Sequence, residues 1–335
     1  MAHQESRSSK DWLWEYRGSY PNSSVFVIAK DNGRIIGTQG MIPISLNVRG
    51  KRYLTGKSEN SLLDKRYRGG TFFQEMYDLT MTKCRERGVC CVWGFTTADK
   101  VWRNKLHFSV YENVVQTYAL TLLPGGALPD KVKSRVSFAI PVLVWLSYLY
   151  SLLRRYTFIS SNVRGRKDVV IENRTRTEND LNSLYGRLRL KYSGLIYIEQ
   201  DSKYLNWRIV NNPRIQYTTY FLYEGALLKA YCYLNIHDKA AHITDFTCED
   251  ITDGAFLLQH VIHDLSKQQA KFVLFLGNVT NHLTAAILGL FKRLGFLRVG
   301  MLQTNFVLQN ISCDENLSDV KDWYINGLWT EGYEW

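Results

Sequence analysis

The spacing of apolar positions predicts a regular alternation of strands and helices in the first third of the chain. Three strands come first, at Val25–Lys30, Arg34–Leu46 and Arg52–Leu63. The turn Asp31-Asn32-Gly33 joins the first two into a hairpin. A helical period then runs from Gly69-Gly70 to Gly88. A buried strand, a short helix and a closing strand follow at Val89–Phe95, Lys100–Leu106 and Tyr111–Leu122.

The second half of the chain repeats this order. It begins with a predicted hairpin at Tyr217–Leu234 and a strand at His242–Cys248. A helix at Thr252–Leu265, capped by Thr252 or Asp253, a buried strand at Lys271–Leu276 and a last helix at Leu283–Leu294 follow. Four landmarks recur in order: Gly33 and Gly225 are 192 residues apart, Gly70 and Gly254 184, Gly94 and Gly277 183, and Phe108 and Phe296 188. The narrow range of these offsets indicates a duplicated unit.

Length and composition are those of a globular chain of about two domains. The 335 residues are 45% hydrophobic and 22% charged, which excludes a disordered or collagen-like chain. The net charge of +11 is uneven. Residues 1–200 carry 31 Lys and Arg against 17 Asp and Glu, a net +14, and residues 201–335 carry 11 against 14, a net −3. An anionic partner of the first 200 residues is expected, which could be nucleic acid, a membrane surface or a phosphorylated small molecule.

The cysteines indicate a reduced compartment. None of the six forms a CxxC pair or a Cys/His cluster with zinc spacing, so we expect no metal site. Met1–Lys10 contains no apolar run, and no secretory leader is expected. The sequence predicts a cytoplasmic location, with membrane association left open by one segment.

That segment is Val136–Leu153, 18 residues without a charge. Lys131, Lys133, Arg135, Arg154 and Arg155 flank it. Its length is at the short limit for a membrane span, and Pro141 and several polar residues make it less apolar than a typical span. We favour a buried helix that connects two domains. A helix lying on a membrane surface and a true span remain open alternatives.

One loop has the features of an anion site. The predicted strand that ends at Leu63 is followed by Asp64-Lys65-Arg66-Tyr67-Arg68-Gly69-Gly70-Thr71 and then a helix. Backbone N–H groups at a helix N-terminus attract anions, and glycines allow close approach. The alternative is an ordinary glycine turn with solvated basic residues.

At this loop the chain resembles the GNAT superfamily of acyl-CoA N-acyltransferases. The run DKRYRGGTFFQEMYDL is similar to its pyrophosphate loop and following helix, and IIGTQGMIP to its preceding strands. VCCVWGF with VWRNKLHF, and later KRLGF, resemble the family's strand–helix ending in each half. YLNWRIVNNP, Tyr204–Pro213, resembles a segment found in some tandem members.

The resemblance implies an α/β fold with mixed sheets: two tandem GNAT-like domains, each a central, mostly antiparallel sheet flanked by helices. We expect an N-terminal domain at 1–127, an apolar connecting helix at 128–165 and a C-terminal domain at 166–335. It implies acyl-CoA as co-substrate, held by Leu62, Leu63, Arg66, Arg68, Gly69, Gly70, Thr71 and Phe72. Thr71 departs from the family's second loop glycine. The second half has Glu249–Gly254 where the loop would be, and its carboxylates would repel a pyrophosphate. One coenzyme A site is therefore expected, in the first unit.

The implied reaction is direct attack of an amine on a thioester. For the base that takes the amine proton we propose Glu59, with Asp64 as an alternative. The family's thiolate-protonating Tyr falls near Trp102, which cannot donate in that way, so Tyr111 and Asn104 are the substitute candidates. Proximity without an essential side-chain base is the other possibility.

The resemblance further implies an acceptor. Tandem members of this type often act on amino sugars, and we expect a dTDP- or UDP-linked amino sugar of surface-polysaccharide biosynthesis. Trp207, Arg208, His242 and Asp245 are the candidate acceptor-binding residues, although an interior strand histidine is more often structural. The alternatives are an aminoacyl-tRNA-dependent peptidoglycan transferase of the tandem GNAT type and a non-catalytic nucleic-acid-binding protein. We expect no nucleic-acid partner, and a peripheral membrane contact through 136–153 remains an alternative.

Overall fold

The chain forms two compact units, each assembled from three separate segments. The computed structural model describes residues 8–18, 24–123, 140–162, 169–172, 178–299 and 304–330. The first unit takes in residues 1–114, 194–216 and 304–322. The second takes in residues 115–193, 217–303 and 323–335.

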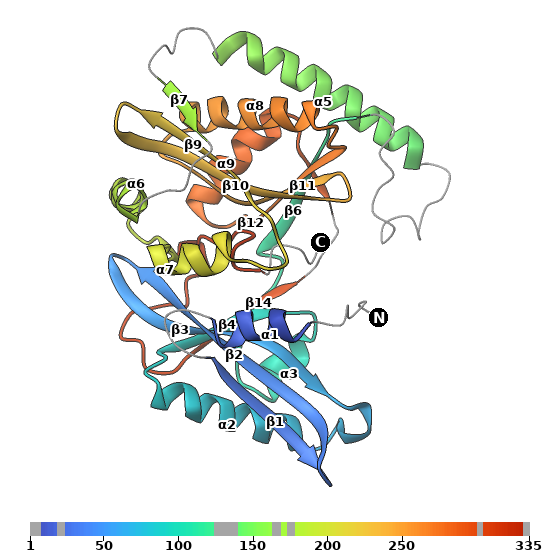
Figure 1. Cartoon of the computed structure of the whole chain (residues 1–335), viewed down its shortest axis with the longest axis vertical. Helices are drawn as coiled ribbons and strands as arrows, with labels where there is room; N and C mark the ends of the chain where they lie inside the picture. Colours follow the sequence, from blue (N-terminus) through green and yellow to red (C-terminus); the bar gives the residue numbers. More distant parts are fainter. Residues whose placement is uncertain are drawn as a thin grey trace. The chain divides into compact units, whose positions relative to one another are not determined.

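The first unit is built on a seven-stranded sheet of order β1-β2-β3-β4-β14-β5, with β8 paired to β2 (Figure 1). Its strands are β1 (Val25–Asp31), β2 (Arg34–Val48), β3 (Lys51–Leu63), β4 (Cys91–Thr96), β5 (Ser109–Tyr111), β8 (Ile196–Ile198) and β14 (Asn305–Asn310). Its helices are α1 (Ser9–Tyr16), α2 (Phe72–Glu86), α3 (Asp99–Asn104) and α7 (Ser202–Leu205), with short turns at Lys65–Tyr67, Asn206–Val210 and Val320–Asp322.

The second unit also holds a seven-stranded sheet, of order β13-β6-β12-β11-β10-β9-β7. Its strands are β6 (Val115–Thr121), β7 (Val169–Glu172), β9 (Thr218–Glu224), β10 (Leu227–His237), β11 (Ala240–Cys248), β12 (Phe272–Asn278) and β13 (Leu297–Val299). Its helices are α5 (Ile140–Asn162), α6 (Glu178–Lys191), α8 (Ile251–Lys267) and α9 (His282–Arg293).

The two sheets repeat one plan, as the sequence offsets predicted. Each has a hairpin, then a third strand, then a helix that leads to a parallel neighbour: β3–α2–β4 in the first unit and β11–α8–β12 in the second. Each sheet then continues with two further antiparallel strands. The order β1-β2-β3-β4-β14-β5 corresponds to β9-β10-β11-β12-β6-β13.

The units exchange one strand. β6 follows β5 in the chain but pairs with β12 and β13 in the second sheet. β14 follows β13 in the chain but pairs with β4 and β5 in the first sheet. The prediction of one closing strand at Tyr111–Leu122 is therefore wrong. The units also depart from the linear division into 1–127, 128–165 and 166–335, because these pairings are made between residues far apart in the sequence.

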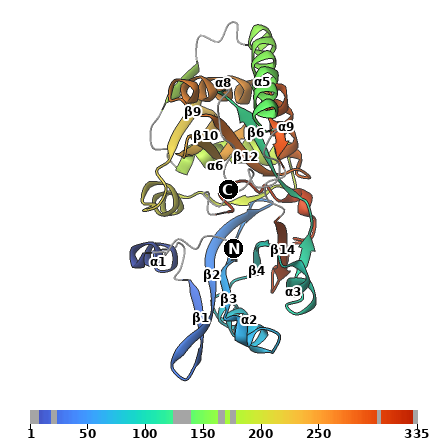
Figure 2. The ribbon, with the colours of Figure 1, turned by 90° about the vertical axis from the view of Figure 1, so that its right-hand side faces the viewer.

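Helix α2 lies against β1 and β2 and is amphipathic (Figure 2). Met76, Tyr77, Thr80, Met81 and Cys84 form its buried face at helical spacing. Tyr77 packs edge-on against Trp102 and Phe108, with ring centroids 5.5 and 5.7 Å away. The helical period from Gly69-Gly70 to Gly88 is confirmed, but Phe72 and Leu79, which it also places among the apolar positions, are 46% and 48% exposed.

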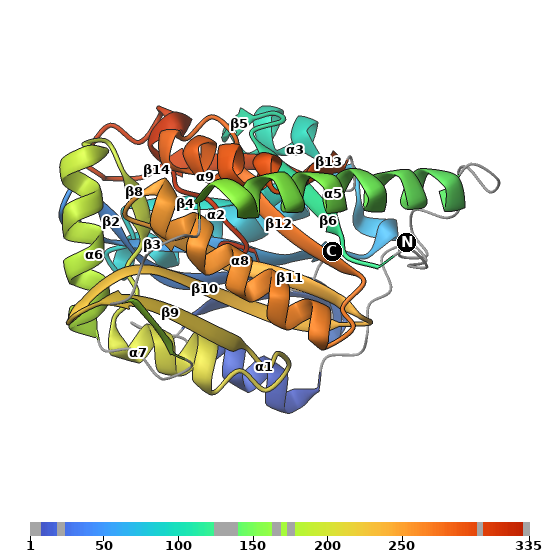
Figure 3. The same ribbon diagram turned by 90° about the horizontal axis from the view of Figure 1, so that it is seen from above.

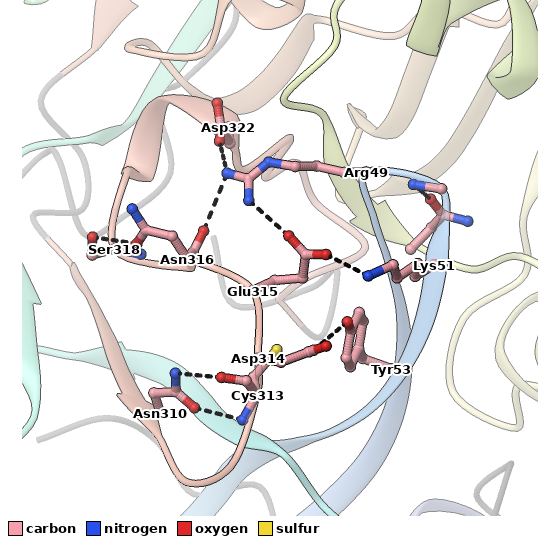
Figure 4. A network of polar contacts seen from close by, with 12 residues as sticks. Arg49, Lys51, Tyr53, Asn310, Cys313, Asp314, Glu315, Asn316, Ser318 and Asp322 are labelled. Carbon is pink, nitrogen blue, oxygen red and sulfur yellow. Dashed lines mark hydrogen bonds and ion pairs between the residues drawn. The ribbon is translucent and has the colours of Figure 1, made fainter.

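The C-terminal segment of the first unit is held by a network of charged groups (Figure 4). Arg49 donates to Asp322 at 2.6 Å and to Glu315 at 3.2 Å, and Lys51 donates to Glu315 at 2.9 Å. The hydrogen bond to Asp322 raises the pKa of Arg49, and the hydrogen bond from Lys51 lowers the pKa of Glu315. These contacts tie the β2–β3 turn to the segment that follows β14.

Helix α5 contradicts the prediction of a buried connecting helix. Leu143, Leu146 and Leu153 are all more than half exposed. Among the residues that the structure describes, no helix is both long and apolar enough to cross a bilayer. The first four residues of the predicted segment 136–153 lie outside the described residues.

Candidate functional site

The parallel pairing between strands β3 and β4, at the middle of the first sheet, ends before either strand does. They pair in parallel only where Thr55–Lys57 meets Cys91–Trp93, although β3 continues to Leu63 and β4 to Thr96. On its other side β3 stays paired with β2 as far as Leu63, with a register shift between Thr38 and Gly40. The last residues of β3 therefore have one strand edge that is outside the β3–β4 ladder.

The shift is fixed by a bulge at Asn60, whose φ is +51°. Its side-chain amide donates to the Tyr16 hydroxyl, and its carbonyl oxygen accepts from Thr38 Oγ1 at 3.1 Å. The Tyr16 ring packs so closely on Gly40 that an added Cβ would lie 2.8 Å from it. A single side chain from α1 thus holds both strands at the bulge.

Gln39 supports the same segment from inside the sheet and is fully buried. Its Nε2 donates to the Gly40 carbonyl oxygen at 2.7 Å and to Ser58 Oγ at 3.1 Å. Its Oε1 accepts from Ser61 Oγ at 2.5 Å. The sequence analysis missed Gln39 and Asn60. The signal that could have found Gln39 is its amide side chain between two glycines and next to the apolar run Met41–Ile44.

The loop after β3 begins with a carboxylate used for structure. Asp64 accepts from the Arg66 side chain at 2.9 Å and from the Arg66 backbone N–H at 3.1 Å. These bonds lower the pKa of Asp64 to about 2. A carboxylate with so low a pKa is a weak base, so the geometry does not favour the alternative that Asp64 takes the amine proton.

The loop ends in an open cradle of backbone groups. Gly69 has φ +95°, which favours glycine, and a Cβ added at either Gly69 or Gly70 would meet nothing within 4 Å. α2 starts directly afterwards, and Thr71 makes no side-chain cap to it. In the described part of the chain, no hydrogen bond reaches the N–H groups of residues 70–73. Such N–H groups at the positive end of a helix dipole suit an anion.

The predicted coenzyme A residues lie together around this cradle. Arg68 Nε donates to the Leu63 carbonyl oxygen at 3.1 Å, so its guanidinium stays beside the end of β3. Tyr67 and Phe72 stack edge-on with centroids 5.7 Å apart. The structure thus places a contiguous group at one strand–helix junction, namely Leu62, Leu63, Arg66, Arg68, Gly69, Gly70, Thr71 and Phe72.

The corresponding junction of the second unit is closed. Asp250 is the N-cap of α8, and its carboxylate accepts from the N–H groups of Thr252 at 2.8 Å and Asp253 at 3.0 Å. The prediction that Thr252 or Asp253 caps this helix is wrong by a few residues. Beside it, Glu249 pairs with Arg187 and Lys229. Burial raises the pKa of Glu249, but these two cations outweigh it and lower the pKa overall. The chain's own carboxylate thus occupies the anion position.

The three predicted catalytic residues lie in different surroundings. Glu59 forms an ion pair with the buried Lys57 within β3. Tyr111 lies on edge strand β5, which β4 and β14 separate from β3, and donates to the Ser318 carbonyl oxygen at 2.8 Å. Asn104 ends α3 and is exposed. Of the three, only Glu59 lies on the strand that leads to the loop, and its role as a base stays a prediction.

Trp102 has a structural role in the core of the first unit. It is almost fully buried, and its ring lies 4.8 Å from Phe108. The position at which the resemblance led us to expect a thiolate-protonating residue is therefore occupied by a core side chain.

The four predicted acceptor residues are buried. In the first unit, Trp207 and Trp14 are joined by two hydrogen bonds. The Trp207 indole N–H donates to the Trp14 backbone carbonyl oxygen at 3.0 Å, and the Trp14 indole N–H donates to that of Trp207 at 2.9 Å. Arg208 lies over the Trp14 ring at 5.8 Å. In the second unit, Asp245 accepts from Tyr231 and Asn326, both at 2.7 Å. These contacts give each of the three a structural role, and acceptor binding by them stays a prediction.

His242, the fourth, is buried on β11. Burial lowers the pKa of its imidazole to about 4, and its Nδ1 has no hydrogen-bond partner among the described residues. It is therefore neutral at pH 7. Among the same residues, no cluster of three His, Cys, Asp or Glu side chains could hold a metal ion.

Comparison with known proteins supports the resemblance. Residues 2–105 match the acetyltransferase (GNAT) domain family. No curated protein matches the chain in sequence. The fold is that of two tandem GNAT-like domains. The family match covers about a third of the chain, and the solved structures described next show the fold.

Three solved structures share this fold at low identity. A probable N-acyltransferase from Enterococcus faecalis has a TM-score of 0.57 and 9% identity over 90% of this chain and 65% of its own. A GCN5-related N-acetyltransferase from Anabaena variabilis has a TM-score of 0.53 and 10% identity, over 85% and 62%. A tandem GNAT protein of the clavulanic acid pathway has a TM-score of 0.52 and 9% identity, over 92% and 90%. The chain spans less than two thirds of the first two.

Proposed function

We propose that the chain transfers an acyl group from acyl-CoA to the amine of a nucleotide-linked amino sugar. The coenzyme would bind at the β3–α2 junction of the first unit. The observation that carries this proposal is the difference between two equivalent helices. The α8 N-terminus is capped by Asp250, whereas the α2 N-terminus follows two glycines and has no side-chain cap.

Different groups of the β3–α2 junction would bind different parts of the coenzyme. The N–H groups of residues 70–73 and the Arg68 guanidinium would hold the pyrophosphate, because both carry positive charge. The strand edge of β3 at Leu62 and Leu63 would orient the rest of the coenzyme by backbone hydrogen bonds. The bulge at Asn60 sets the direction of that edge.

Acyl-CoA supplies the thioester carbonyl carbon that the amine attacks. The new C–N bond replaces the C–S bond, the amine loses a proton, and the departing thiolate takes up a proton from solvent to leave as the thiol. Glu59 is our proposed acceptor of that proton, directly or through water. A backbone N–H at the end of β3 would stabilise the negative charge that develops on the carbonyl oxygen.

The acceptor class rests on the family resemblance and on charge. A nucleoside diphosphate sugar is a second anionic ligand, in keeping with the net +14 of residues 1–200. dTDP- and UDP-linked amino sugars of surface polysaccharides are the proposed acceptors. The acyl group is most simply acetyl.

The first test is a thermal-shift screen of the full chain. It compares CoA, acetyl-CoA and dTDP- and UDP-linked amino sugars, with tRNA and duplex DNA as controls. A ligand at 100 times its Kd adds about 2.7 kcal/mol of stability, a shift of several degrees. Stabilisation by CoA and by one nucleotide class, followed by thiol release on mixing the two substrates, is the expected result.

The other outcomes are equally informative. Stabilisation by tRNA or DNA alone would refute the coenzyme site. Stabilisation by CoA without any by nucleotide sugars would retain the coenzyme site and refute the proposed acceptor.

A further inference from the structure

Helix α5 of the second unit exposes apolar side chains to solvent and turns two serines toward the unit. Between residues 142 and 156 every exposed side chain is apolar or aromatic, namely Val142, Leu143, Trp145, Leu146, Leu149, Tyr150, Leu152, Leu153 and Tyr156. The side chains that point to the body of the unit include Ser147 and Ser151. A helix on the surface of a water-soluble domain normally has the opposite arrangement.

The inward contacts are made by Val144, which is 7% exposed, and by two serines. Ser151 donates to the Thr121 carbonyl oxygen at 2.7 Å, and Ser147 shares a hydrogen bond with the Thr121 hydroxyl at 2.9 Å. A Cβ added at Gly295 would lie 2.8 Å from Ser151 Cα, so the backbones approach closely there. The helix is therefore docked on β6 by its serine face, which leaves the apolar face outside.

This apolar face continues onto a neighbouring helix. α5 runs along α8 and α9 (Figure 3), and a groove of about 640 Å³ is lined by Leu149, Leu152, Leu153, Tyr156, Ile262 and Leu294, among others. Trp145, Leu146 and Leu153 are 53%, 55% and 62% exposed. A contiguous apolar surface that is exposed to water marks an interaction site.

Charge identifies the partner. By sequence, residues 131–167 contain eight Lys and Arg and no Asp or Glu, which is +8 of the chain's total of +11. Arg154 and Arg155 belong to α5 and are half-buried, and Arg155 Nε donates to the Ser151 carbonyl oxygen at 3.3 Å. The other six cations lie outside the described residues. A symmetric dimer through this face would join two copies of a strongly cationic stretch of sequence, and like charges oppose that. An anionic lipid surface meets both the apolar and the basic character.

We propose that α5 docks the protein on the surface of an anionic membrane, with its apolar face in the interface between headgroups and acyl chains. The helix lies along the membrane. This inference does not depend on the proposed acyl transfer, because it concerns a different surface.

The test is flotation of the full chain with vesicles. We expect it to float with phosphatidylcholine vesicles that contain about one third phosphatidylglycerol, and to stay in solution with pure phosphatidylcholine. Salt at about 0.5 M should weaken the binding by screening. The double variant Leu146→Gln/Leu153→Gln, altered only at exposed positions, should lower the partition coefficient about tenfold or more.

Leu190→Gln is the matched control, because Leu190 is 89% exposed on α6 and lies outside the proposed face. It should float like the wild-type chain. Lipids brominated in their acyl chains should quench part of the tryptophan emission, and Trp145→Phe should remove that part.

Three results would overturn the proposal. One is flotation of the double variant at wild-type level. A second is equal flotation with neutral vesicles. The third is a vesicle-free dimer that the double variant converts to a monomer while the wild-type chain fails to float, which would assign the face to a second copy of the chain.

Discussion

Replacing Gly70 with alanine separates the binding role of the loop from its folding role. Gly70, unlike Gly69, has no positive φ, and its Cβ would point into open space. The backbone can therefore accept alanine without strain. Because alanine restricts the unfolded chain more than glycine does, Gly70→Ala should stabilise the fold by about 0.4–1 kcal/mol.

The effect on coenzyme binding should have the opposite sign. If the pyrophosphate lies against the N–H groups of residues 70–73, the added methyl group occupies the space that it needs. Loss of one charge-assisted contact costs about 1.5–3 kcal/mol, which is roughly a 10- to 150-fold rise in the Kd for CoA. The variant should therefore be more stable and bind more weakly.

Titration calorimetry with CoA and urea unfolding measure the two effects on the same preparation. Gly186→Ala is the matched control: its Cβ also meets nothing within 4 Å, but it lies on α6 of the second unit. It should be stabilised by about 0.8–1 kcal/mol with unchanged CoA affinity. Gly70→Ala that binds CoA as tightly as the wild-type chain would refute the placement of the pyrophosphate at this loop.

Three further predictions concern single side chains. Glu59→Gln should lower kcat roughly 100-fold at saturating substrates; a change below about threefold with a lower Tm would assign Glu59 to its ion pair with Lys57. Burial lowers the pKa of His242 to about 4 in the folded state, whereas in the unfolded chain it is about 6.5. The unfolded state therefore takes up the proton first as the pH falls below 6.5, and the free energy of unfolding drops by at most about 3 kcal/mol toward pH 4. His242→Leu should flatten that part of a pH series of urea unfolding curves, and an unchanged slope would contradict it. Trp207→Phe removes the indole donor to Trp14 and should cost about 1–2 kcal/mol; unchanged stability with weaker acceptor binding would instead make Trp207 a ligand residue.

Local features of the sequence determined the elements of each unit. Strand and helix periods depend on residues close in the chain, so β3, the glycine loop and the helical period of α2 were all predictable. The duplication was also readable, because equivalent turns and glycines keep their spacing. These same features drew attention to the candidate coenzyme loop.

Three decisions belonged to the tertiary structure. The exchange of β6 and β14 depends on pairings across much of the chain, and a strand's pattern does not name its partner. The sequence predicts Trp207 and Arg208 as acceptor-binding residues, and only the folded unit shows that both are buried against Trp14. For α5, an apolar run predicts only that its side chains are buried in an apolar environment. Whether the apolar face meets a core or another surface was decided by Ser147 and Ser151, whose hydrogen bonds to Thr121 turn that face outward.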